Sequence, residues 1–114
     1  MPKPLPTTVT ATIAAGSSLS DAADLSTGTM YYLIAPDDWD AADLSFQVSE
    51  DNVTFYDLFD NKGYEVTRLV VTGAAVNTDP TWTQAAMWLK LRSGPRVSPV
   101  TQDADRVFKL VLVP

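Results

Sequence analysis

The chain has 114 residues, a formal net charge of −6, and neither cysteine nor histidine. The length is that of a single domain, and the lack of cysteine excludes disulfides, thiolate nucleophiles and thiolate metal sites. The acidic balance argues against nucleic acid and against an anionic membrane surface as partners, because both attract clustered basic side chains.

The chain begins with a proline-rich segment. In residues 1–6, MPKPLP, proline stands at every second position. Each proline fixes φ and lacks an N–H, so the segment favours an extended conformation. It has no apolar stretch of the secretory type, and we expect no cleaved export signal. One interpretation is a frayed terminus, and the other is an arm, residues 1–7, that docks on a neighbouring subunit. In the second interpretation the contact residues are Pro2, Lys3, Pro4, Leu5 and Pro6.

Three strands are predicted in the first third of the chain. Residues 7–14 alternate between apolar residues and threonine, which is typical of a half-buried strand. A short strand is predicted within residues 19–25. Residues 29–36, TMYYLIAP, are almost continuously apolar, which predicts a strand covered on both faces.

The clearest pattern in the chain is a hairpin. Residues 44–49, LSFQVS, alternate strictly and lead into a turn in which Asn52 is suited to a positive φ. Residues 53–59 return as a second strand, and their apolar residues are too many for one face, which predicts either a bulge or a strand covered on both faces. The link before the hairpin, residues 37–43, is expected to be irregular or to form one helical turn.

The rest of the chain continues in the same way, and no stretch of a dozen residues has helical period. We therefore predict an all-β fold, an antiparallel and jelly-roll-like β-sandwich of seven or eight strands that forms one domain over residues 8–114. The remaining strands are predicted at residues 64–73, 86–94 and 106–114.

The absence of histidine removes the usual general base and the commonest metal ligand. Paired carboxylates could still act in catalysis, but nearly all aspartates fall at predicted turns, where they bond the backbone. We therefore predict no enzymatic activity and no cofactor.

A calcium site is the remaining alternative to a capped turn, because PDDWDAAD places four carboxylates within seven residues. Its ligands would be Asp37, Asp38, Asp40 and Asp43.

Residues 86–94 alternate between an apolar set and a set with one tryptophan and two cations. If the apolar set faces the core, the other set forms an outward contact face, since tryptophan and arginine are enriched at protein interfaces. The alternative is that this tryptophan faces the core or lies under a loop. The apolar set is Met87, Leu89 and Leu91, and the outward set is Trp88, Lys90 and Arg92.

The two other tryptophans, Trp39 and Trp82, lie in predicted loops. Loop tryptophans can form a stacking platform for a sugar ring, so these two residues are the candidates for glycan binding.

The stretch from Trp39 to Leu58, WDAADLSFQVSEDNVTFYDL, resembles a pattern found in small β-sandwich proteins of tailed bacteriophages and related particles. There a tryptophan and an alanine-rich link precede LTFQVS, an Asp-Gly-type turn and TFYDL, whereas here Asn52 stands where glycine usually stands. WLKLRSG at 88–94 and the final RVFKLVLVP fit the same pattern, so the resemblance covers about two-thirds of the chain. VSEDNVTFYDL is also similar to the strand-turn-strand of discoidin-like, galactose-binding jelly rolls.

The phage resemblance implies a non-enzymatic virion component, either a capsid decoration protein or the base of a head spike or fibre. Such a protein is made in the host cytoplasm, forms homo-oligomers and docks on the exterior of the particle, with capsid or other virion proteins as partners. Neither nucleic acid nor membrane is expected, and no catalytic residue carries over because the pattern contains none. The alternative is a recognition module of a tail or fibre that binds host glycan through the loops near Trp39 and Trp82.

Overall fold

The computed structural model describes residues 3–114, which form an all-β sandwich of two antiparallel sheets. The predicted fold class is therefore confirmed, with nine strands in the described residues where seven or eight were expected. In chain order the elements are β1 (Thr7–Ile13), β2 (Ala23–Asp24), β3 (Thr29–Ile34), β4 (Leu44–Ser49), β5 (Tyr56–Asp57), β6 (Thr67–Arg68), β7 (Ala75–Asn77), α1 (Pro80–Thr83), β8 (Trp88–Ser93) and β9 (Arg106–Val113).

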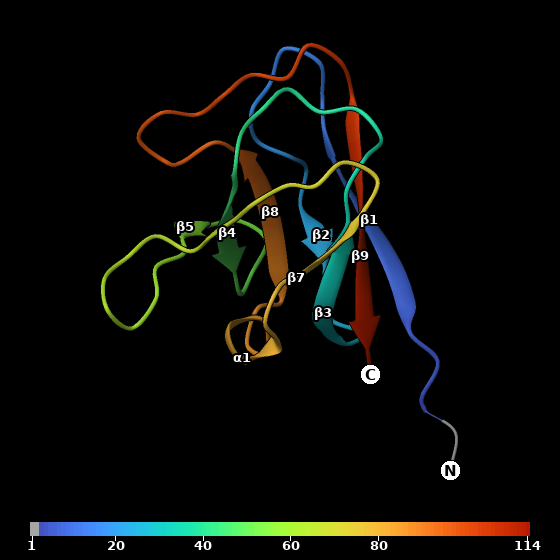
Figure 1. The fold of residues 1–114 in the computed structure, drawn as a ribbon. Helices are drawn as coiled ribbons and strands as arrows, with labels where there is room; N and C mark the ends of the chain where they lie inside the picture. Colours follow the sequence, from blue (N-terminus) through green and yellow to red (C-terminus); the bar gives the residue numbers. More distant parts are fainter. Residues whose placement is uncertain (1–2) are drawn as a thin grey trace.

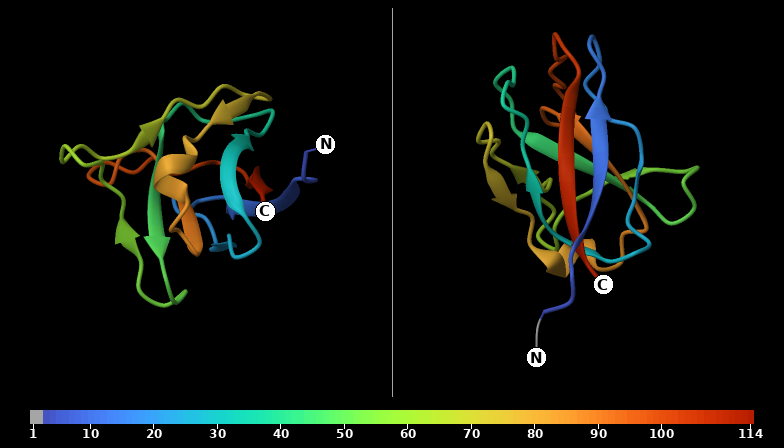
Figure 2. Two further views of the ribbon diagram at one scale, coloured as in Figure 1. Left: turned by 90° about the horizontal axis from the view of Figure 1, so that it is seen from below. Right: turned by 90° about the vertical axis from the view of Figure 1, so that its right-hand side faces the viewer.

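The two sheets form the two layers of the sandwich (Figure 1). The first sheet has the strand order β1-β9-β3-β7, and the second has the order β2-β8-β4-β5 with β6 also paired to β4. The first and last long strands are neighbours, because β1 pairs with β9 from Thr7 opposite Leu112 to Ile13 opposite Arg106. This pairing joins the two ends of the chain, and Figure 2 shows both termini at the same end of the sandwich.

The core follows from the alternation of side chains along the strands. On β9, Phe108 and Leu110 are fully buried in the core, whereas Val107 between them and the start of the strand is 45% exposed. Phe46 on β4 and the leucines of β8 meet them from the second sheet. Each large apolar side chain buried in this way stabilises the fold by about 1.5–3 kcal/mol.

The returning half of the predicted hairpin is only partly a strand. Of residues 53–59, β5 alone pairs with β4. The turn before it is held by the Asp51 carboxylate, which accepts two backbone N–H groups of the turn, and by Asn52, whose φ is 59° as predicted. These bonds give the backbone an alternative to the sheet ladder and so shorten the strand.

The predicted strand at residues 64–73 is wrong except for β6. Val66 is the one apolar side chain of this segment that is buried in the core, whereas Leu69 and Val71 are 71% and 53% exposed. The alternation of this segment therefore does not reflect a sheet face.

Residues 74–84, between two of the predicted strands, were expected to form a loop but contain two regular elements, β7 and α1. The helix begins after Asp79, whose side chain accepts the N–H of Thr81, and Pro80 occupies its first turn. A carboxylate cap followed by proline is a favourable helix start. The link at residues 37–43 has no helical turn. Within residues 3–114 no helix is long and apolar enough to cross a membrane.

Candidate functional site

The proline-rich arm lies outside the sandwich. Lys3, Pro4, Leu5 and Pro6 are all exposed, and Leu5 retains 85% of its accessible surface. Pro2 lies outside the described residues. Figure 2 shows the arm leaving β1 beyond the end of the first sheet, near the C-terminus. The predicted contact residues 3–6 are therefore accessible to a neighbouring molecule.

The outer face of the first sheet is the largely apolar surface next to this arm. On β9, Val107, Val111 and Val113 alternate with the core residues, and Lys109 is the one charged side chain among these outward positions. Val107 is 45% exposed, whereas Val111 is buried at 5%. No further layer packs on this face in the part of the chain that the structure describes. An uncovered apolar sheet face marks an interaction surface.

Two tyrosines of β3 extend the same face. The register of β3 shifts between Met30 and Tyr32, and both Tyr31 and Tyr32 are partly exposed, at 42% and 37%. The prediction that residues 29–36 are covered on both faces is therefore wrong, because the second sheet covers only the inner side. None of these residues was predicted as a site residue, although apolar side chains on both faces of residues 106–114 were a visible signal in the sequence.

The outer face has a hollow at each end. The larger, which we call the arm groove, has a volume of about 520 Å³ and lies between the arm and the sheet. The smaller, of about 190 Å³, lies where β9 passes the loop after β3. The arm groove is lined by Lys3, Pro4, Pro6, Tyr31, Tyr32, Asn77, Val111 and Val113.

The contact face predicted on β8 is only partly available. Leu89 and Leu91 are fully buried as predicted, but Met87 is 43% exposed and does not belong to the core. Trp88 and Lys90 are half-buried, and the Lys90 ammonium lies 4.4 Å from the centre of the Phe55 ring.

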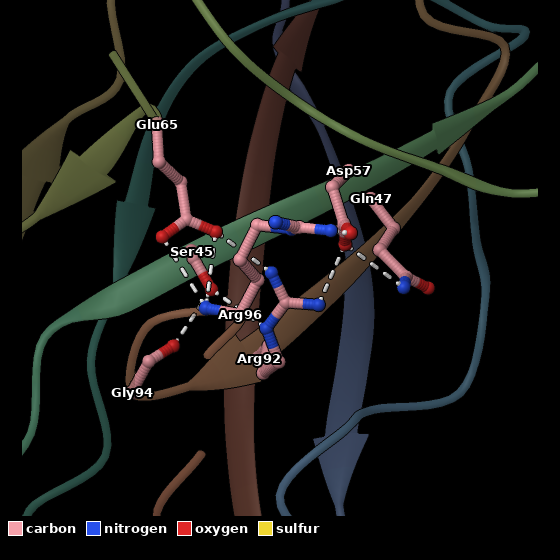
Figure 3. Close-up of polar contacts among 7 residues, drawn as sticks. All are labelled: Ser45, Gln47, Asp57, Glu65, Arg92, Gly94 and Arg96. Carbon is pink, nitrogen blue, oxygen red and sulfur yellow. Dashed lines mark hydrogen bonds and ion pairs between the residues drawn. The ribbon is translucent and has the colours of Figure 1, made fainter. Parts of the chain in front are cut away.

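Arg92, the third residue of that predicted face, is not on the surface. Its side chain is 8% exposed, and Nη1 lies 2.7 Å from the Asp57 carboxylate while Nη2 lies 2.9 Å from the Glu65 carboxylate (Figure 3). Its Nε donates to the Ser45 hydroxyl at 2.9 Å. Arg92 is buried because the segment from β5 to β6 folds over it with two carboxylates, so the expectation of an exposed contact residue is wrong.

Arg96 binds the same two acids from the solvent side. Its Nε lies 3.0 Å from Asp57, and its backbone N–H donates to the Glu65 carboxylate. The pKa of Asp57 is lowered from its usual 3.8 to about 2. The main cause is the hydrogen bond from Arg92, with smaller contributions from Arg96 and Gln47, and burial of the carboxylate acts in the opposite direction. Asp57 therefore stays ionised across the physiological range, which suits a structural anion rather than a proton donor.

A second buried arginine, Arg106 at the start of β9, organises the loops around it. Arg106 is 5% exposed and donates to Asp103 at 2.7 Å and to the Gln102 side chain at 3.0 Å. Asp38 and Asp40 lie 3.6 Å from the same guanidinium. No group of three or more potential metal ligands is found among residues 3–114. The four aspartates considered for calcium thus do not converge, and two of them face an arginine instead.

The structure does not bring the two candidate glycan residues together. Trp39 lies in the loop between β3 and β4, and Trp82 lies in α1 at the opposite end of the molecule (Figure 1). Trp39 packs edge-on against Phe108 with ring centres 5.2 Å apart, and its Nε1 donates to the Ala42 carbonyl.

The indole of Trp82 also packs against other side chains of the protein. The indole lies 4.9 Å from the Phe46 ring centre, and the Arg68 guanidinium sits 5.7 Å from the indole centre. Its Nε1 is buried without a hydrogen-bond partner in the described residues. Both tryptophans thus pack on the core, and a platform that uses the two together is not formed.

Comparison of the chain with protein-family models, with curated proteins and with solved structures found no match.

Proposed function

We propose that this chain is a non-enzymatic structural component of a phage-like particle, a capsid decoration protein or the base of a head spike or fibre. It acts by self-association and by docking on the shell. The observation that carries the proposal is the apolar outer face of the first sheet, which lies uncovered beside an exposed proline arm. A face of this kind on a chain of net charge −6 suits a lasting contact with protein.

The choice of a phage-like particle comes from the resemblance of residues 39–58 and of the two last long strands to small virion β-sandwich proteins. The buried arginine networks support a structural role, because they tie loops from distant parts of the sequence into fixed positions. A rigid body with one apolar docking face suits repeated attachment to a shell.

The proposal is tested on particles of the virus whose genome encodes the chain. Mass spectrometry of gradient-purified particles should detect the chain at many copies, and the purified chain should bind particles stripped of it. Particles that assemble and attach normally without the chain in them would overturn the proposal.

The outer face makes a sharper prediction for the same binding measurement. Val107→Asp places a charge on the apolar face and should reduce binding to stripped particles at least about tenfold. Val97→Asp is the matched control, because Val97 is an exposed loop valine that does not line either hollow of the outer face. Equal binding by the two variants would exclude the outer face as the docking surface.

A further inference from the structure

The free edge of β1 is the long unprotected edge of this sandwich. β1 has seven residues, whereas the other edge strands of the two sheets, β7, β2 and β5, have two or three. The sequence of β1, TTVTATI, contains no charge, proline or glycine, and its pairing with β9 runs without a bulge. Natural edge strands are usually protected by a charged side chain, a proline or a bulge, each of which hinders pairing with another chain.

The hydrogen bonds of Thr12 show which backbone groups point to the open side. The Thr12 N–H donates to the Asp21 carboxylate at 2.8 Å, and the Thr12 carbonyl accepts the Asp21 N–H at 3.1 Å. Both groups therefore point away from β9. Because backbone direction repeats every second residue, the N–H and C=O groups of Thr8 and Thr10 point the same way. Both threonines are exposed, and no loop in residues 3–114 bonds to these groups.

We propose that β1 pairs antiparallel with β1 of a second copy of this chain around a two-fold axis at Val9. This inference deepens the proposed function, because it names the partner through which the chain self-associates. The register sets Thr8 opposite Thr10 of the second copy and makes four backbone hydrogen bonds. The two first sheets then form one continuous sheet of eight strands.

The ends of the edge fit this register. Pro6 lies opposite Thr12 of the second copy, and Pro6 has no N–H to donate where the Thr12 carbonyl is already bonded by Asp21. Asp21 blocks the edge only at that end, so the pairing is limited to the exposed threonines.

The charges at the two ends of β1 are complementary. Lys3 precedes the strand, while Asp21 binds Thr12 and Asp105 binds the N–H of Ala15 just beyond it. In an antiparallel pair the start of one strand lies beside the end of the other, so Lys3 of each copy comes to the acidic end of its partner. The strand between them is neutral, although each chain carries a net charge of −6. This edge is therefore where two acidic chains can meet with the least repulsion.

The test is analytical ultracentrifugation of the purified full chain. The wild-type chain should sediment at low concentration as a species of 12.4 kDa and at high concentration as one of twice that mass. The double variant Thr8→Lys with Thr10→Lys sets like charges opposite each other and should raise the dimer dissociation constant about tenfold to thirtyfold. Thr72→Lys with Thr101→Lys is the matched control, because these exposed threonines lie in loops and not in β1.

A mixing experiment separates lost pairing from lost folding. The chain with both threonines changed to glutamate should also be monomeric, and an equimolar mixture with the lysine variant should restore the dimer. A wild-type chain that stays monomeric at millimolar concentration overturns the pairing, as does a dimer that the lysine variant leaves intact or a mixture that stays monomeric. A dimer that never binds particles would uphold the pairing and contradict the proposed function. A chain that stays monomeric but binds particles would contradict the pairing and uphold the docking on the shell.

Discussion

Arg92 shows how one buried cation organises two loops. It comes from the middle of the second sheet, yet its three donor groups are bonded by Ser45, Asp57 and Glu65. A buried guanidinium without its acids would be an unpaired charge, so the segments that carry Asp57 and Glu65 must close over it for the second sheet to form. Arg96 binds the same acids but is about half exposed, so its contribution is screened by water.

We expect replacement of each of the two arginines to lower the stability of the protein by a different amount. Arg92→Leu leaves two partly buried carboxylates without their main partner and should lower the free energy of unfolding by about 3 kcal/mol. Arg96→Leu should lower it by less than about 1 kcal/mol. Urea unfolding followed by tryptophan fluorescence measures both. Similar losses in the two variants would show that the buried network does not stabilise the fold more than a surface pair.

The pKa of Asp57 predicts how stability depends on acid. The folded-state pKa of about 2 lies below the ordinary value of 3.8, so the unfolded chain binds this proton more tightly than the folded chain. The stabilisation by the Asp57 carboxylate is therefore complete above about pH 4 and is lost as the pH falls toward 2. Asp57→Asn should unfold at lower urea concentration at neutral pH and should lose less additional stability in this window than the wild type. A parallel acid dependence of the two proteins would contradict the assignment.

The loop after β8 must turn within a confined space, and Gly94 makes this possible. Its φ is +85°, and a Cβ at this position would come within 2.8 Å of the Ser98 carbonyl oxygen and 2.9 Å of the Val100 nitrogen. The Gly94 N–H and C=O are bonded to Asp43 and Ser45, which connect the loop to β4. The turn at Gly63 has almost the same φ, +84°, but open space around it.

The two glycines form a matched pair for measurement. Gly63→Ala should cost about 1 kcal/mol, the strain of a left-handed alanine. Gly94→Ala adds a clash with backbone atoms that cannot move independently, and it should cost at least about 2 kcal/mol more. Thermal unfolding of the two variants measures the difference. Equal melting temperatures would mean that the loop from 94 to 100 can shift to accept a side chain.

The protein as a unit is a rigid sandwich with one long open strand, one apolar face and one exposed arm. These three features all belong to the first sheet, and the second sheet carries the Arg92 network and the loops that cover it. In the function proposed above, this division places assembly on the first sheet and internal stability on the second. The arm contributes to the outer face and not to the core, since residues 3–6 are exposed.

Removal of residues 1–6 therefore separates assembly from folding. The deletion keeps Thr7, which pairs with Leu112, and the melting temperature should change by less than about 2 °C. Binding to stripped particles should weaken, because the deletion opens the arm groove and removes Leu5. The control is Val97→Asp, which changes an exposed loop residue outside the arm and the outer face and should leave binding unchanged. If the truncated chain attached to particles as well as the intact one, the arm would have no role in docking.

Local sequence was sufficient for the strands whose two faces differ. β1, β4, β8 and β9 lie within a residue or two of their predicted bounds, because strict alternation places one set of side chains against the core whatever the partner strand is. The positive φ of Asn52 and the burial of Leu89 and Leu91 follow from equally local chemistry.

The same patterns could not show which outward faces become covered. Lys90 and Arg92 occupy equivalent positions on β8, yet only Arg92 is enclosed, because Asp57 and Glu65 arrive from a segment distant in sequence. Val107 of β9 and the tyrosines of β3 remain partly exposed for the converse reason, that no third layer exists in residues 3–114 to meet them. Burial is a property of two surfaces in contact, so periodicity in one segment predicts the strand and its two faces, and only packing decides what each face meets.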